Sequence, residues 1–165
     1  GDYLVYKVSR TISRYFRISL CRESFCFLSA LLTISNSFHF LSTRLFELEP
    51  EAKGIFGFKD DLTMEELAKH ERFSKHATYF IQMIDKALGM LGPDIELLTE
   101  ILMDLGLKHA KYGVKPEYFP SMGRALIHSV ESQLGTDSFS REIKDAWVEV
   151  YGALSYDMIR AQRNH

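Results

Sequence analysis

The sequence of 165 residues predicts an all-α protein with four long helices and shorter helices upstream, on three observations. Apolar residues recur at steps of three and four over four long segments, which is the period of one helix face. Residues that begin or end helices, such as Ser, Thr, Gly and Pro, stand at the ends of these segments. No segment alternates between apolar and polar residues for long enough to predict a strand.

The first long helix is expected to begin at a capping box, because Thr63 is followed three residues later by Glu66. Gly92 and Pro93 are expected to stop this helix, since neither residue continues a helix well. Between these signals lies one continuous apolar face, formed by Phe73, Ala77, Phe80, Ile84, Leu88 and Leu91.

Three further helices follow, each with its own boundary signal. The second covers residues 95–109, and Pro116 predicts the start of the third, which Gly135 closes. Ser140 is placed to cap the fourth. The inward faces of the three helices are Ile95, Leu98, Leu102, Leu105 and His109; then Phe119, Met122, Leu126, Val130 and Leu134; then Ile143, Trp147, Val150, Leu154 and Met158.

The front of the chain differs from the rest. Residues 1–35 are rich in Arg and Ser and carry a net charge of +3, although the whole chain carries −2. The organisation predicted is an atypical leader over 1–41, which is either native or foreign to the domain, and a helical domain over 42–165. The apolar run at 25–34 is shorter than the roughly 20 residues that span a bilayer, so no membrane span is expected. We expect a cytoplasmic protein, with organellar targeting by the basic leader as the alternative.

Charge and cysteine content exclude several classes of function. Twenty basic residues nearly balance 22 acidic ones, so the chain has no overall attraction to nucleic acid. The two cysteines, Cys21 and Cys26, form neither a disulfide framework nor a CxxC pair for zinc or redox chemistry.

Two histidines are candidate metal ligands. His109 stands one turn after Leu105 on an apolar face, and His76 stands four residues before Phe80 on the aromatic face of the first long helix. Two imidazoles on buried faces of two helices can meet across a flat apolar cofactor, for which iron in haem is the best match. The alternative is that both are hydrogen-bonded core residues. The other histidines, His39, His70, His128 and His165, are interpreted as bystanders.

Four segments together resemble the globin family in order and spacing, most closely neuroglobins and single-domain bacterial haemoglobins. They are RLFELEPEAKGIFGF at 44–58, FSKHATYFIQMID at 73–85, LGLKHAKYGVKPEYFPSMGRALI at 105–127 and AWVEVYGAL at 146–154. The resemblance covers about residues 44–161 and implies a globin fold around a haem pocket. Upstream, the usual first helix with its Trp is not recognisable, and Ser42 falls at a distal position that usually holds a large apolar residue or Tyr.

The resemblance also implies roles for individual residues. His109 matches the proximal iron ligand, and His76 matches the distal histidine, which either donates a hydrogen bond to bound O2 or ligates the iron itself. The remaining matches are expected to contact the cofactor: Phe56 and Phe58 at its edge, Phe80 over the iron, and Leu105, Val114, Phe119 and Tyr151 along the pocket wall.

The function implied is reversible binding of O2 or another diatomic gas at the iron of haem b, for storage, transport or sensing. A first alternative is an enzyme, either a nitric oxide dioxygenase or a nitrite reductase. It would need an external reductase, because the sequence has no GxGxxG pattern for a dinucleotide. A second alternative is a helical interaction domain without haem, in which both histidines are core residues.

Overall fold

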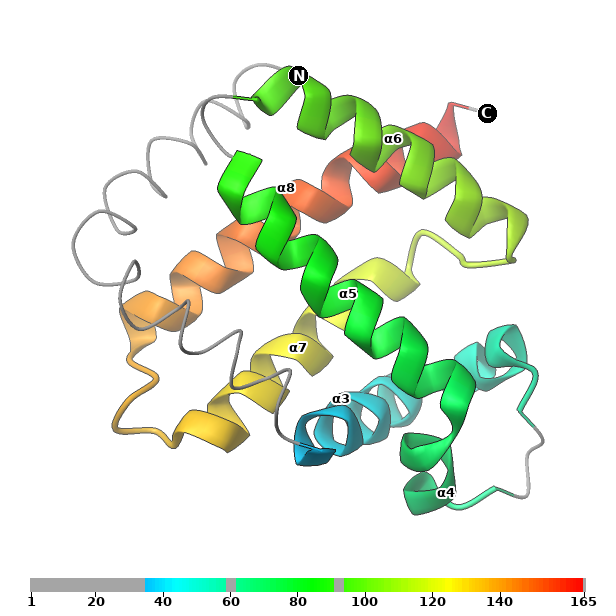
Figure 1. The fold of residues 1–165 in the computed structure, drawn as a ribbon, viewed down its shortest axis with the longest axis vertical. Coiled ribbons are helices and arrows are strands. Elements are labelled where there is room, and N and C mark those ends of the chain that lie inside the picture. Colours follow the sequence, from blue (N-terminus) through cyan, green and yellow to red (C-terminus); the bar gives the residue numbers. More distant parts are fainter. Residues whose placement is uncertain (1–34, 59–61, 91–93, 165) are drawn as a thin grey trace.

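A computed structural model of the chain describes residues 35–58, 62–90 and 94–164, and all its regular elements there are helices (Figure 1). This result confirms the predicted all-α class for the part of the chain described. None of these helices is long and apolar enough to cross a membrane. The elements are α3 (Ser35–Leu48), the 3-10 helix η2 (Pro50–Phe56), α4 (Met64–Lys69), α5 (Glu71–Met90), α6 (Ile95–Lys111), α7 (Tyr118–Leu134) and α8 (Arg141–Arg163).

Three of the predicted boundary signals are confirmed. The Thr63 hydroxyl accepts a hydrogen bond from the Glu66 amide, and the Glu66 carboxylate accepts one from the Thr63 amide at 2.8 Å, which completes the capping box. Ser140 caps α8 by accepting from the amide of Ile143 at 3.4 Å. Gly135 ends α7 with a φ of 75°, a conformation that side chains disfavour. The predicted stop at Gly92 and Pro93 lies outside the described residues, as does Leu91.

The prediction of one continuous helix from the capping box onward is wrong, because the chain breaks at His70. This residue is extended, with φ −68° and ψ 129°, and it separates α4 from α5. Its Nδ1 accepts a hydrogen bond from the amide of Arg72 at 3.3 Å, and its carbonyl accepts one from the amide of Ser74 at 3.0 Å. The bond from Ser74 is the first regular bond of α5, and the His70 ring caps the helix by accepting from the Arg72 amide, which lacks a partner in the first turn.

Two other boundaries differ from the sequence-based positions. Helix α7 begins at Tyr118, two residues after Pro116, because the intervening residues form a turn in which the Tyr118 amide donates to the carbonyl of Lys115. Helix α3 begins at Ser35 and carries the buried Leu41, so it crosses the predicted limit between leader and domain. The division at residue 42 stays a prediction, since residues 1–34 are not described.

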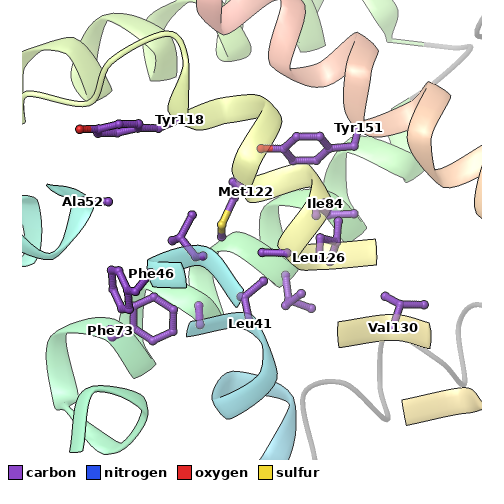
Figure 2. Packing of buried hydrophobic residues seen from close by; sticks show 14 of the residues in the cluster. Leu41, Phe46, Ala52, Phe73, Ile84, Tyr118, Met122, Leu126, Val130 and Tyr151 are labelled. Atoms are coloured by element: carbon purple, nitrogen blue, oxygen red, sulfur yellow. The ribbon is translucent and has the colours of Figure 1, made fainter. Parts of the chain in front are cut away.

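The helices pack as two pairs, which meet where α7 packs against α8 and where α5 crosses both. Helix α3 packs mainly against α7, α6 packs mainly against α8, and α5 contacts α3, α4 and α6 as it crosses the molecule (Figure 1). The larger hydrophobic cluster lies around α3, α5 and α7, and Figure 2 shows the rings of Phe46 and Phe73 side by side within it, with their centres 5.4 Å apart. A second cluster fills the space between α6 and α8. Helices α5, α7 and α8 contribute residues to both clusters, and α6 contributes only to the second.

Two glycines allow α8 to approach its neighbours closely. A Cβ atom added to Gly106 of α6 would lie 2.4 Å from the carbonyl oxygen of Met158, so the two backbones touch at this point. A Cβ atom added to Gly123 of α7 would lie 2.5 Å from the ring of Tyr151. Figure 2 shows this ring reaching from α8 across α7. Both helix crossings therefore depend on the missing side chain.

Candidate functional site

His109 lies near the end of α6, where its ring is oriented by the helix itself. Its Nδ1 atom is 2.7 Å from the carbonyl oxygen of Leu105, one turn earlier. A carbonyl oxygen only accepts hydrogen bonds, so this contact requires Nδ1 to carry the proton and to donate it. In the neutral ring this leaves Nε2 with a free lone pair, which is the form of imidazole that binds a metal ion.

His76 lies on α5 and is largely buried. Burial lowers the pKa of His76 to about 4, with a smaller contribution from the nearby His109. Desolvation has this sign because it penalises the charged imidazolium. His76 is therefore neutral at neutral pH, and it too has a lone pair available for a metal ion or a hydrogen bond.

The two imidazoles are neighbours, one on α5 and the other on α6. Their ring centres are 6.3 Å apart, and the ring planes meet at 71°. Metal–imidazole bonds of about 2 Å, with roughly 1.2 Å from each nitrogen to its ring centre, require about 6.4 Å for one ion held between two rings. The observed separation of the ring centres is close to this distance.

Aromatic side chains flank both histidines. Phe56, the last residue of η2, lies 5.3 Å from the ring of His76 and stacks on Phe58 at 5.6 Å. On the other side, Phe119 of α7 lies 5.6 Å from the ring of His109. The helices thus bring five predicted site residues, from four elements and one loop, into a continuous series of ring contacts.

The remaining four predicted site residues line the same region. Phe80 and Tyr151 meet at 6.1 Å between α5 and α8, and burial raises the pKa of the Tyr151 phenol far above its usual value. Leu105 and Val114 are partly buried against the cluster between α6 and α8, and the Val114 amide donates to the carbonyl of His109 at 3.0 Å. Contacts of all nine residues with a haem stay predictions, because the structure gives only their contacts with one another.

Among the other residues named in the sequence analysis, His70, interpreted there as a bystander, lies against the end of this series, with its ring centre 4.6 Å from that of Phe58. The others fall outside it. Ser42 is fully buried on α3, and His128 is exposed on α7. His165 and the side chain of His39 lie outside the described residues. Arg72 was missed, although its guanidinium reaches the carbonyl oxygen of Phe56 at 3.2 Å. Its position one turn before His76 was the only sequence signal.

The two imidazoles form a donor set that could hold a metal-containing group between two helices. The ring centres lie 6.3 Å apart, His76 is neutral, and apolar and aromatic side chains surround both rings. Two nitrogens provide only part of a coordination sphere, and among the described residues no group of three or more His, Cys, Asp or Glu side chains could hold a metal ion. Iron in haem brings four ring nitrogens of its own and needs only axial ligands from the protein.

Comparisons with known proteins identify the family. The globin family model matches residues 39–158, and neuroglobin of Tetraodon nigroviridis is 31% identical over 121 residues, covering 73% of this chain and 75% of that protein. The chain belongs to the globin family, and with it to the haem-binding and gas-binding proteins. An anaerobic nitrite reductase of Gossypium hirsutum is 29% identical over 133 residues, which cover 79% of this chain and 82% of that protein.

A solved structure shows the same fold. The hexacoordinated haem protein of an anhydrobiotic tardigrade aligns with a TM-score of 0.73 at 19% identity, over 86% of this chain and 89% of that one. The predicted globin fold is thereby confirmed.

Proposed function

We propose that the chain binds haem b with His109 as the proximal ligand and His76 as a second axial ligand, and that it takes up O2 or another diatomic gas in place of His76. The observation that carries this proposal is the 6.3 Å separation of the His76 and His109 ring centres, on two neighbouring helices. Ferrous iron in haem would supply the gas-binding chemistry. The residues of the chain would hold the haem and control the access of the gas to the iron.

His109 would hold the haem from the α6 side. Its hydrogen bond to the Leu105 carbonyl fixes the ring orientation and increases the basicity of Nε2, which strengthens the bond to a metal ion. Phe119 packs beside the ring and limits its rotation. Val114 ties the following loop to the carbonyl of His109, so the ligand and the pocket wall move together.

His76 controls the gas side. Because His76 is neutral and lies beside His109, it would compete with a gas for the iron of a haem held there. The apparent gas affinity is then reduced by the fraction of molecules in which His76 has moved away. Phe80 and the neutral phenol of Tyr151 contribute apolar surface nearby, which limits water in the region. A site of this kind suits regulated binding or sensing of a gas.

A His76→Leu variant tests this role. We expect its ferrous, haem-loaded form to bind carbon monoxide at a rate that rises linearly with gas concentration, because no protein ligand has to leave first. The wild-type rate should instead reach a limit, and at high gas concentration it should be at least about tenfold slower than the variant rate. Rapid mixing followed by absorption measures both.

The matched control is His128→Leu, which removes an exposed histidine from α7. It should behave as the wild type. Equal rates in the wild type and in His76→Leu would show that His76 does not occupy the gas position.

Reduction of nitrite by the ferrous protein is a second candidate, favoured by the similarity to the nitrite reductase of Gossypium hirsutum. It would use the same two histidines and would draw electrons from an external reductase. Formation of nitric oxide from nitrite, above the rate given by free haem, separates this activity from simple gas binding.

A further inference from the structure

Arg72 links helix α5 to the chain segment that carries Phe56. Its Nη1 donates a hydrogen bond of 3.2 Å to the carbonyl oxygen of Phe56, across 16 residues of sequence. Arg72 and His76 are four residues apart on α5, so they lie on the same face of the helix, one turn from each other. Helix α5 therefore contacts Phe56 twice: Arg72 binds its backbone carbonyl, and His76 contacts its ring.

The turn after Phe56 is shaped to receive this guanidinium. Gly57 has a φ of 70°, and a Cβ atom at this position would lie 2.7 Å from Nη1 of Arg72. Two backbone hydrogen bonds close the turn, from the Gly57 amide to the Gly54 carbonyl and from the Phe58 amide to the Lys53 carbonyl. The turn is thus a closed unit, and Arg72 fastens it to α5.

The ring of Phe56 fills the space on one side of His76. It lies 5.3 Å from the imidazole and is supported from behind by Phe46 at 5.8 Å and by Phe73 at 5.4 Å. Movement of His76 toward this side requires the ring to shift. The ring can shift only if its backbone moves as well, because two other rings pack against it. The contact from Arg72 to the Phe56 carbonyl opposes that backbone movement.

We propose that Arg72 is a positioning residue that holds Phe56 against His76 and thereby slows the departure of His76 from the iron. The inference rests on the proposed function, in which His76 is an axial ligand. Arg72 touches neither the cofactor nor the gas in this account, and it acts only through Phe56. Arg72 affects the rate at which His76 leaves the iron. His76 itself is the group that occupies the gas position.

The test is the rate of carbon monoxide binding to ferrous, haem-loaded Arg72→Met. Methionine keeps an unbranched side chain but donates no hydrogen bond. At saturating gas the binding rate equals the rate at which His76 leaves, and we expect this limit to rise about three- to tenfold, the effect of losing one hydrogen bond. Arg72→Lys keeps a cationic hydrogen-bond donor, so its limiting rate should lie between those of the wild type and Arg72→Met. Arg44→Met, which removes a surface arginine paired with Glu47, should match the wild type.

Two further readouts separate positioning from a general loss of structure. In a His76→Leu background, Arg72→Met should leave the rate of gas binding unchanged, because no protein ligand then has to move. In the haem-free protein, the amide of Gly57 should exchange with solvent faster in Arg72→Met than in the wild type. An effect of equal size in the His76→Leu background, or unchanged exchange at Gly57, would overturn the inference.

The outcomes also separate this inference from the proposed function. A wild-type rate that saturates, combined with an unchanged limit in Arg72→Met, overturns the role of Arg72 alone. A wild-type rate that rises linearly with gas concentration overturns both that role and the axial ligation by His76.

Discussion

Replacing His109 with alanine is expected to abolish stable haem binding. Outer partners of a metal ligand typically contribute 10–100-fold to affinity, so removing the ligand itself should weaken haem binding by more than about 100-fold. The loss comes from the missing bond between Nε2 and the iron, because the surrounding rings of Phe56, Phe58 and Phe119 remain in place. Titration of the haem-free protein with haem, followed by its absorption, measures the affinity.

A soluble ligand and a second histidine serve as controls. Imidazole added to His109→Ala should occupy the space left by the side chain and restore part of the haem affinity. His128→Ala, on the exposed face of α7, should bind haem like the wild type. Helix content, measured by circular dichroism, should be the same in all three proteins. Wild-type haem affinity in His109→Ala would show that the proximal ligand is another residue.

Replacing Gly106 with alanine is expected to lower the free energy of unfolding by about 2 kcal/mol or more, as overpacking of a close contact does. The new Cβ atom would lie 2.4 Å from the carbonyl oxygen and 2.7 Å from the Cα atom of Met158. These are backbone atoms, so α6 and α8 must move apart. Since His109 lies one turn further along α6, the same movement displaces it, and haem affinity should fall as well. Urea unfolding of the haem-free protein measures the free energy of unfolding without any contribution from bound haem.

Gly152→Ala is the matched control, because Gly152 is an exposed glycine of α8 and an added Cβ atom would have no neighbour within 4 Å. Alanine is the better helix former, so this variant should gain about 0.5–1 kcal/mol. If Gly106→Ala gained a similar amount, the close crossing of α6 and α8 would be contradicted.

The helix boundaries predicted correctly are those with a local cause. The capping box at Thr63, the cap at Ser140 and the turn at Gly135 each depend on residues within four positions of one another, and the sequence displays them directly. The break at His70 was missed for the opposite reason. It depends on a ring nitrogen meeting the amide of Arg72, and histidine is not among the residues that usually cap helices.

The site was predicted as a set of residues but not as a geometry. Periodicity places His76 and His109 on inward faces, and the globin resemblance gives them roles. Their 6.3 Å separation, however, depends on how α5 and α6 cross. Arg72 could not be predicted, because a long side chain that reaches a backbone carbonyl 16 residues away leaves no pattern in the sequence.

The most direct test of axial ligation by both histidines is the visible absorption spectrum of the ferrous protein, loaded with haem and free of oxygen. We expect one haem per chain and a pair of sharp bands, which indicate iron with two axial ligands from the protein. A single broad band would mean that one axial position is empty, and it would contradict the assignment of His76 as an iron ligand.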